Sequence, residues 1–139
     1  MIVLDTDVIS EALSLTPDPV YVARMSQVDM NDAYVTAISF GEMRAGVELL
    51  PAGHRRDLLD VRINILFERD FAGHVLDFNS SAAFEFGEIA GKLGEAAFTE
   101  LLMDAQIAAI ARARGASVAT RNIKHFRLFD VPLFNPWDA

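Results

Sequence analysis

The 139-residue sequence contains no cysteine. This absence excludes structural disulfides, thiol catalysis and zinc sites built from thiolate ligands. Long apolar runs are absent as well, since no segment approaches the roughly 20 residues of a membrane-spanning helix. The amino terminus also lacks the basic region and following apolar stretch of a secretory signal. We therefore expect a cytoplasmic protein that does not use a membrane.

Positive charge is scarce, with 12 Lys and Arg residues against 20 Asp and Glu residues and a net charge of −8. This balance argues against nucleic-acid binding driven by overall charge, but it allows a local basic patch or contacts through a metal ion. The last third of the chain contains a basic stretch made of Arg112, Arg114, Arg121, Lys124 and Arg127, with His125 among them. A solvated helix end and loop would account for this basic stretch equally well.

Apolar residues are plentiful by contrast, because they make up 52% of the chain. We therefore expect a compact fold without disordered tracts. At this length a single domain over residues 1–139 can bury a core without crosslinks. No internal repeat, low-complexity tract or flexible linker interrupts the sequence.

Short β-like runs alternate with longer segments of helical periodicity, which is typical of βαβ units around a parallel sheet. Strands are predicted at Ile2–Asp5, Tyr34–Thr36, Val75–Asp77, Ser117–Thr120 and Pro132–Phe134. Helices are predicted at Val8–Leu15, Pro19–Val28, Phe40–Leu50, His54–Phe71, Ser80–Leu93 and Met103–Arg114. The predicted fold class is α/β with a parallel sheet.

Polar residues stand at several of the predicted strand ends. Asp5 ends the first strand, Glu42 lies in the first turn of the helix after the second strand, and Asn122 follows the fourth strand. In a parallel sheet these residues would gather at the carboxyl edge, where open α/β sheets bind ligands. Asp104 lies in the first turn of its predicted helix, and the strand pattern alone does not place it at that edge.

Helix capping alone would also explain these residues, because Asp, Asn and Ser favour caps and acids favour the first helical turn. The segment Ser39-Phe40-Gly41-Glu42 matches a capping box in which Glu42 reaches back to the backbone of Ser39. Neighbouring carboxylates, however, repel one another, and a divalent cation relieves that repulsion. Oxygen ligands without His or Cys suit Mg²⁺ or Mn²⁺, whose bound water can attack a phosphodiester. Taken together, the four positions predict metal-dependent phosphoryl chemistry.

Four ordered motifs resemble those of a known family, the PIN-domain toxins of the VapC type, and its FitB-like branch in particular. They are Met1-Ile2-Val3-Leu4-Asp5-Thr6-Asp7-Val8-Ile9-Ser10-Glu11, Ser39-Phe40-Gly41-Glu42-Met43-Arg44-Ala45-Gly46, Asp104-Ala105-Gln106-Ile107-Ala108-Ala109-Ile110-Ala111 with Gly115, and Ala119-Thr120-Arg121-Asn122. The family usually has Asp-Thr-Asn in the first motif, so Asp7 is a variant. The ending Phe134-Asn135-Pro136-Trp137 is also similar, and the resemblance covers the full chain.

This resemblance implies a PIN-like three-layer sandwich with a five-stranded parallel sheet flanked by helices. It implies an Mg²⁺- or Mn²⁺-dependent endoribonuclease whose toxicity comes from RNA cleavage. It further implies inhibition by a small VapB-like antitoxin, and assembly as a homodimer and as a toxin–antitoxin hetero-oligomer. By motif match, Asp5, Glu42 and Asp104 would bind the metal, with Asp104 beside Asp5 and Asn122 completing the catalytic set. An amide supplies no charge, so one metal ion and two metal ions both stay open.

Two other functions are compatible with parts of the sequence. A catalytically weak PIN module could act mainly as an antitoxin-binding co-repressor, and Asn122 is the feature that favours it. A phosphoacceptor switch would use Asp77 after the third strand, but it needs a Lys after the fifth strand, which Pro132-Leu133-Phe134-Asn135-Pro136 lacks. We set that third interpretation aside.

Several further residues carry weaker expectations. Thr6 and Thr120 could orient the metal ligands through their hydroxyls. Arg44 could contact the antitoxin or a phosphate, or form a structural ion pair. The three histidines, His54, His74 and His125, are expected to face solvent, and the aromatic residues Phe84, Phe86, Phe98 and Trp137 are expected in the core or an interface.

Overall fold

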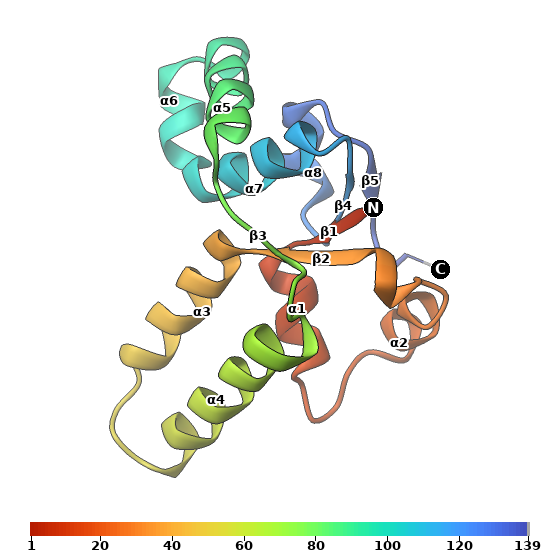
Figure 1. The fold of residues 1–139 in the computed structure, drawn as a ribbon, viewed down its shortest axis with the longest axis vertical. Coiled ribbons are helices and arrows are strands. Elements are labelled where there is room, and N and C mark those ends of the chain that lie inside the picture. Colours follow the sequence, from red (N-terminus) through yellow and green to blue (C-terminus); the bar gives the residue numbers. More distant parts are fainter. Residues whose placement is uncertain (139) are drawn as a thin grey trace.

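The computed structural model describes residues 1–138, which alternate between short strands and helices (Figure 1). The strands are β1 (Ile2–Leu4), β2 (Ala33–Thr36), β3 (Val75–Leu76), β4 (Ser117–Ala119) and β5 (Leu133–Phe134). The helices are α1 (Thr6–Ala12), α2 (Pro19–Met25), α3 (Ala37–Glu48), α4 (His54–Ile65), α5 (Ser80–Leu93), α6 (Glu95–Glu100), α7 (Leu102–Ala113) and α8 (Ile123–Phe126). Ala139, the last residue of the predicted domain, lies outside the described residues.

The strands form one five-stranded sheet in the order β3-β2-β1-β4-β5, and every pairing is parallel. In the register, Leu4 of β1 lies beside Ala119 of β4, and Val3 lies beside Tyr34 of β2. The chain leaves β1 toward β2 on one side and reaches β4 on the other side much later. The gap between β1 and β4 is therefore a topological switch point, where α/β folds form crevices at the carboxyl edge. The predicted parallel sheet is confirmed.

Helices cover both faces of this sheet, which gives the three-layer sandwich expected from the resemblance. Val3 and Val118 pack into one core with the apolar residues of α5, α7 and α8. Their neighbours Leu4 and Ala119 pack into a second core with residues of α1 to α4. Figure 1 shows the α3–α4 hairpin and the α5–α6 pair extending from the sheet in opposite directions. Within residues 1–138, no helix has both the length and the apolar character needed to span a bilayer.

Helix α7 is buried because small side chains line much of its length. Ala105, Ala108, Ala109 and Ala111 are fully buried, so the helix backbone can lie close to the sheet and to α5. The helix ends as predicted at Gly115, whose φ of +64° is the left-handed conformation that glycine adopts readily. There the N–H of Gly115 donates to the carbonyl of Arg112 (3.1 Å), and the next N–H, of Ala116, donates to Ala111 (2.9 Å).

The start of α3 differs from the prediction. The helix begins at Ala37 rather than at Phe40, and Thr36 caps it by accepting a hydrogen bond from the N–H of Ser39 (3.1 Å). Glu42 consequently lies in the second turn and not in the first, and the capping box between Ser39 and Glu42 does not form. Strand β2 thus passes into helix α3 without a loop, and this leaves the Glu42 side chain available for other contacts.

Other boundaries shift for local reasons. The long predicted helix His54–Phe71 ends at Ile65 and continues as a π-helical turn over Leu66–Asp70, closed by the N–H of Phe71 donating to the carbonyl of Leu66 (2.9 Å). Leu66, Phe67 and Phe71 are all buried, so this turn brings three apolar side chains into the second core. The short helices α6 and α8 were not predicted, because one or two turns carry little periodic signal.

Candidate active site

Asp5 lies directly after β1 at the switch point, and its side chain is almost inaccessible, at 4% exposure. One carboxylate oxygen accepts the N–H of Thr6 (2.8 Å), and the other accepts the hydroxyl of Thr120 from the end of β4 (2.8 Å). Burial, with a smaller contribution from the charge of Asp104, raises the pKa of Asp5 to about 7, although these two hydrogen bonds lower it. A buried acid with so high a pKa is typical of a functional site.

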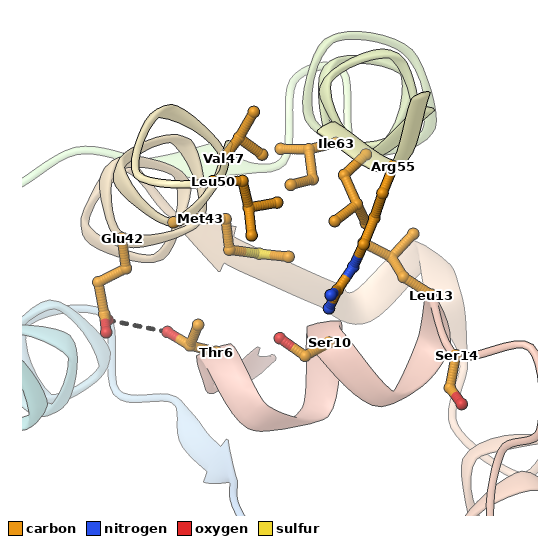
Figure 2. A pocket seen from close by; sticks show the side chains of 12 residues that line it. Thr6, Ser10, Leu13, Ser14, Glu42, Met43, Val47, Leu50, Arg55 and Ile63 are labelled. Carbon is orange, nitrogen blue, oxygen red and sulfur yellow. Dashed lines mark hydrogen bonds between the residues drawn. The ribbon is translucent and has the colours of Figure 1, made fainter. Parts of the chain in front are cut away.

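Glu42 reaches the same edge from α3. Its carboxylate accepts the hydroxyl of Thr6 (2.9 Å, Figure 2). The Thr6 hydroxyl also lies 2.9 Å from the buried hydroxyl of Ser39. Burial raises the pKa of Glu42, and the charges of Asp104 and Asp7 add to this rise. Thr6 therefore connects the two acids, since its backbone holds Asp5 and its side chain holds Glu42.

Asp104 comes to this edge because α7 runs back along the sheet toward the start of β4. A helix that leads into the beginning of a parallel strand must itself begin near the opposite, carboxyl edge. Asp104 lies in the first turn of α7, as predicted. Burial raises its pKa, the nearby His125 lowers it, and the charge of Asp7 raises it. The structure thus brings Asp104 into electrostatic contact with Asp5 and Glu42.

Asp7 is a fourth acid at the site, although the sequence marked it only as a variant of the first motif. Its side chain is exposed in the first turn of α1, and its charge raises the pKa of each of the other three acids. We refer to Asp5, Asp7, Glu42 and Asp104 together as the acidic cluster. Its members come from three separate stretches of the chain and repel one another when ionised.

Asn122 lies at the edge of the acidic cluster and connects to it through two neighbours. Its backbone N–H donates to the hydroxyl of Thr120 (2.9 Å), the same hydroxyl that donates to Asp5. Its side-chain amide lies 2.6 Å from Nδ1 of His125, and that nitrogen lies 3.7 Å from the carboxylate of Asp104. His125 was expected to face solvent, and this is wrong in part, because its ring bridges two predicted site residues. Nothing but its position three residues after Asn122 could have indicated this.

Other predicted residues have structural roles. Arg44 forms ion pairs with Asp60 of α4 and with Glu48 of its own helix. Of the three roles considered for Arg44, the structure shows the structural ion pair. His54 is exposed, as expected, whereas His74 stacks on Tyr34 with 4.3 Å between the ring centroids. Phe86 and Phe98 pack together as predicted, but Phe84 is 71% exposed.

An open apolar groove of about 440 Å³ extends from the acidic cluster between α1, α3 and α4 (Figure 2). Thr6 and Glu42 stand at one end, and Arg55 of α4 points into it toward Ser10. The wall between them is made by Leu13, Met43, Val47, Leu50, Leu59 and Ile63. The groove could hold an extended peptide with an apolar middle and a basic residue at the Glu42 end.

The ligand chemistry of the cluster is that of a hard cation, because it offers carboxylate oxygens and hydroxyls. Within residues 1–138, no group of three His, Asp or Glu side chains is arranged to hold a metal ion by itself. Mg²⁺ needs no such closed cage, since it commonly binds one or two carboxylates and completes its shell with water and substrate phosphate. The residues therefore fit a partly hydrated divalent ion better than a fully enclosed one.

Comparison with known proteins agrees with this arrangement. Residues 2–130 match the PIN domain family. The chain is 36% identical to toxin FitB of Neisseria gonorrhoeae over 137 residues, which cover 99% of each chain, and 33% identical to VapC ribonuclease Y4jK of Sinorhizobium fredii over 138 residues, again 99% of each. A solved structure of FitAB bound to an IR36 DNA fragment superposes with a TM-score of 0.87 at 36% identity, covering 100% of this chain and 97% of the other.

These matches span nearly the whole chain and include both a named toxin and a named ribonuclease. The five-stranded parallel sheet and its two helical layers are shared with the FitAB structure. The acidic cluster lies at the carboxyl edge of that shared sheet. The chain is therefore a PIN-domain protein, and it belongs to the family that includes the FitB and VapC toxins.

Proposed function

We propose that this protein is the toxin of a type II toxin–antitoxin system and acts as an Mg²⁺- or Mn²⁺-dependent endoribonuclease. The observation that carries the proposal is the acidic cluster, in which burial and mutual repulsion raise the pKa values of Asp5, Glu42 and Asp104. Family membership supports the same chemistry, because relatives across the full length are named as toxin and as VapC ribonuclease.

A divalent ion would be held by Asp5, Glu42 and Asp104, directly or through water. When bound, it supplies an activated water and stabilises the charge that develops on the phosphodiester. The residues of the chain would hold the ligand carboxylates in fixed orientations. Thr6 and Thr120 each donate one hydrogen bond to a different Asp5 oxygen, so each oxygen keeps a lone pair that a metal ion or its water could use.

Cleavage of RNA by the purified chain tests this proposal. We expect Mn²⁺ or Mg²⁺ to support cleavage and EDTA to stop it, and we expect Asp5→Ala or Asp104→Asn to lower the rate roughly 100-fold or more. Asp77→Asn is the matched control, because Asp77 is an exposed acid after β3 that makes no contact with the acidic cluster among the described residues. Cleavage that survives EDTA, or that the two cluster variants leave intact, would overturn the mechanism.

The proposed partner is a small VapB-like antitoxin, in a complex that also contains a toxin homodimer. The solved relative FitAB, in which a second component accompanies the toxin on DNA, supports such an assembly. The groove beside Glu42 could receive a segment of the antitoxin, whose basic side chain the acidic cluster would attract. Growth arrest on expression, relieved by a short neighbouring gene, is the expected genetic result.

Asn122 favours a second candidate, a co-repressor with little catalytic activity. Its amide hydrogen-bonds with His125 and adds no charge to the acidic cluster. If weak metal binding limits activity, Asn122→Asp should raise the cleavage rate and lower the Mn²⁺ concentration that gives half-maximal rate. A wild-type chain that cleaves no RNA and arrests no growth would make the co-repressor the better account. An Asn122→Asp variant with unchanged Mn²⁺ dependence would show that the fourth charge is not limiting.

A further inference from the structure

The basic stretch contains one cation whose position suggests contact with substrate. Arg112 is already occupied, because it pairs with Glu85 (2.8 Å) and Glu88 (3.0 Å) and donates to the carbonyl of Phe129 (3.0 Å). Arg121 is exposed, and within residues 1–138 no carboxylate lies within ion-pair distance of it. It also directly precedes Asn122.

Arg121 is fixed by aromatic packing rather than by an ion pair. Its guanidinium lies over the ring of Trp137, 4.8 Å from the ring centroid. Trp137 in turn packs on Tyr21 with 5.0 Å between centroids, and the Tyr21 hydroxyl donates to the carbonyl of Val8 in α1 (2.7 Å). The backbone N–H of Trp137 donates to the side-chain oxygen of Asn135 (3.0 Å). This chain of contacts holds Arg121 in a defined place relative to α1, which carries part of the acidic cluster.

Arg121 also shares a cleft with Asp7, one member of the acidic cluster. The cleft has a volume of about 300 Å³ and is lined by Arg121, Trp137, Asp7, Ser10 and Glu11. A guanidinium that stacks through its flat face keeps its edge N–H groups free for a phosphate, to which it can make two parallel hydrogen bonds. The cleft therefore places a phosphate-binding group beside Asp7 of the acidic cluster, and Ser10 lines both this cleft and the apolar groove.

We propose that Arg121, held over Trp137, binds a backbone phosphate of single-stranded RNA beside the phosphodiester that the acidic cluster cleaves. This inference rests on the proposed ribonuclease function and adds the residue that positions the substrate. A chain with a net charge of −8 repels RNA as a whole, so it needs a local cation at the site. Arg121 supplies that cation and would set which phosphodiester is presented to the acids.

RNA binding without cleavage gives the first test. A labelled single-stranded RNA is titrated in Mn²⁺ with the Asp104→Asn chain and with the same chain carrying Arg121→Ala. We expect Arg121→Ala to raise Kd roughly tenfold, the value of one charged hydrogen-bonded contact. The slope of log affinity against log salt should become shallower by about 0.7, as one phosphate contact is lost. Arg127→Ala is the matched control, because it removes the same charge from an exposed position in the same stretch.

Steady-state cleavage gives the second test, in an otherwise unmodified chain. Arg121→Ala should raise KM roughly tenfold and leave kcat within about twofold, since the lost contact is to a non-reacting phosphate. Arg121→Lys should give an intermediate KM, because lysine keeps the charge but loses the planar, two-bond geometry. Thermal unfolding of each variant checks that the fold is retained.

Three results would overturn the assignment. One is an unchanged Kd and salt slope in Arg121→Ala, and another is an equal loss in Arg127→Ala, which would show general charge only. The third is unchanged RNA binding with weakened capture of a co-expressed antitoxin, which would assign Arg121 to a protein contact. If the wild-type chain does not cleave RNA while Arg121-dependent binding persists, the proposed function fails and the RNA contact stands.

Discussion

Burial of the Asp5 carboxylate, with Asp104 and Asp7 adding to the effect, raises its pKa from 3.8 to about 7. The folded chain therefore binds this proton more tightly than the unfolded chain does. The stability that comes with the protonated acid is fully present below about pH 4 and is lost as the pH rises through 7. A shift of this size corresponds to roughly 4 kcal/mol of folding free energy lost in metal-free solution at high pH.

Asp5→Asn should accordingly stabilise the metal-free protein. The amide oxygen can still accept the N–H of Thr6, and the amide nitrogen can donate to the Thr120 hydroxyl, which adapts to either role. In EDTA we expect a higher melting temperature for Asp5→Asn, with a larger gain at pH 8 than at pH 5. Asp77→Asn serves as the exposed control with little change. An equal gain at both pH values, or a loss at pH 8, would contradict the assigned pKa.

At the scale of helices and strands, sequence reasoning succeeded where a start or stop signal is local. The predicted bounds of α5, Ser80–Leu93, match the structure, because Asn79 caps its start by accepting the N–H of Ala82 (3.0 Å) and Gly94 ends it. The end of α7 was predicted from Gly115 for the same reason. Signals of this kind lie within a few residues of the boundary and need no tertiary information.

Sequence reasoning failed where two local signals compete or where packing decides. Thr36 and Ser39 are both good caps, and only the end of β2 at Thr36 selects the earlier one. The π-helical turn after α4 follows from the burial of Leu66, Phe67 and Phe71 in the second core, which no local pattern encodes. In both cases, at the start of α3 and after α4, the local sequence did not determine where the helical turns begin and end.

The candidate site shows the same division between local and tertiary information. Asp5, Glu42 and Asp104 were identified from motif order, and in the fold the charge of Asp104 raises the pKa of both Asp5 and Glu42. Asp104 could not be placed from the strand pattern, because its position depends on α7 running back along the sheet, and strand order was not known in advance. The bridge from Asn122 through His125 to Asp104 depends on the short helix α8, which carries no periodic signal. The catalytic roles of Asp5, Glu42, Asp104 and Asn122 stay predictions.

Over the whole molecule, the acidic cluster joins the ends of segments that belong to both core layers. Asp5 and Asp7 stand at the start of α1 and Glu42 lies on α3 on one side of the sheet, whereas Asp104 lies on α7 on the other. Ionised acids push these elements apart, and a divalent ion between them would reverse that repulsion. Metal binding should therefore be visible in global stability and not only in cleavage.

Thermal unfolding with and without Mn²⁺ measures this effect on the intact chain. An ion that binds only the folded protein stabilises it by about 2.7 kcal/mol at a concentration 100 times its Kd, so the melting temperature should rise by several degrees and fall again on adding EDTA. Asp104→Asn should lose most of this rise, because the site then holds fewer charges, while Asp77→Asn should keep it. A rise that is the same in both variants would mean that Mn²⁺ binds the acidic surface of this chain in general, since its net charge of −8 attracts cations everywhere. A rise confined to chains with an intact acidic cluster would instead locate the ion between the two layers, at the topological switch point between β1 and β4.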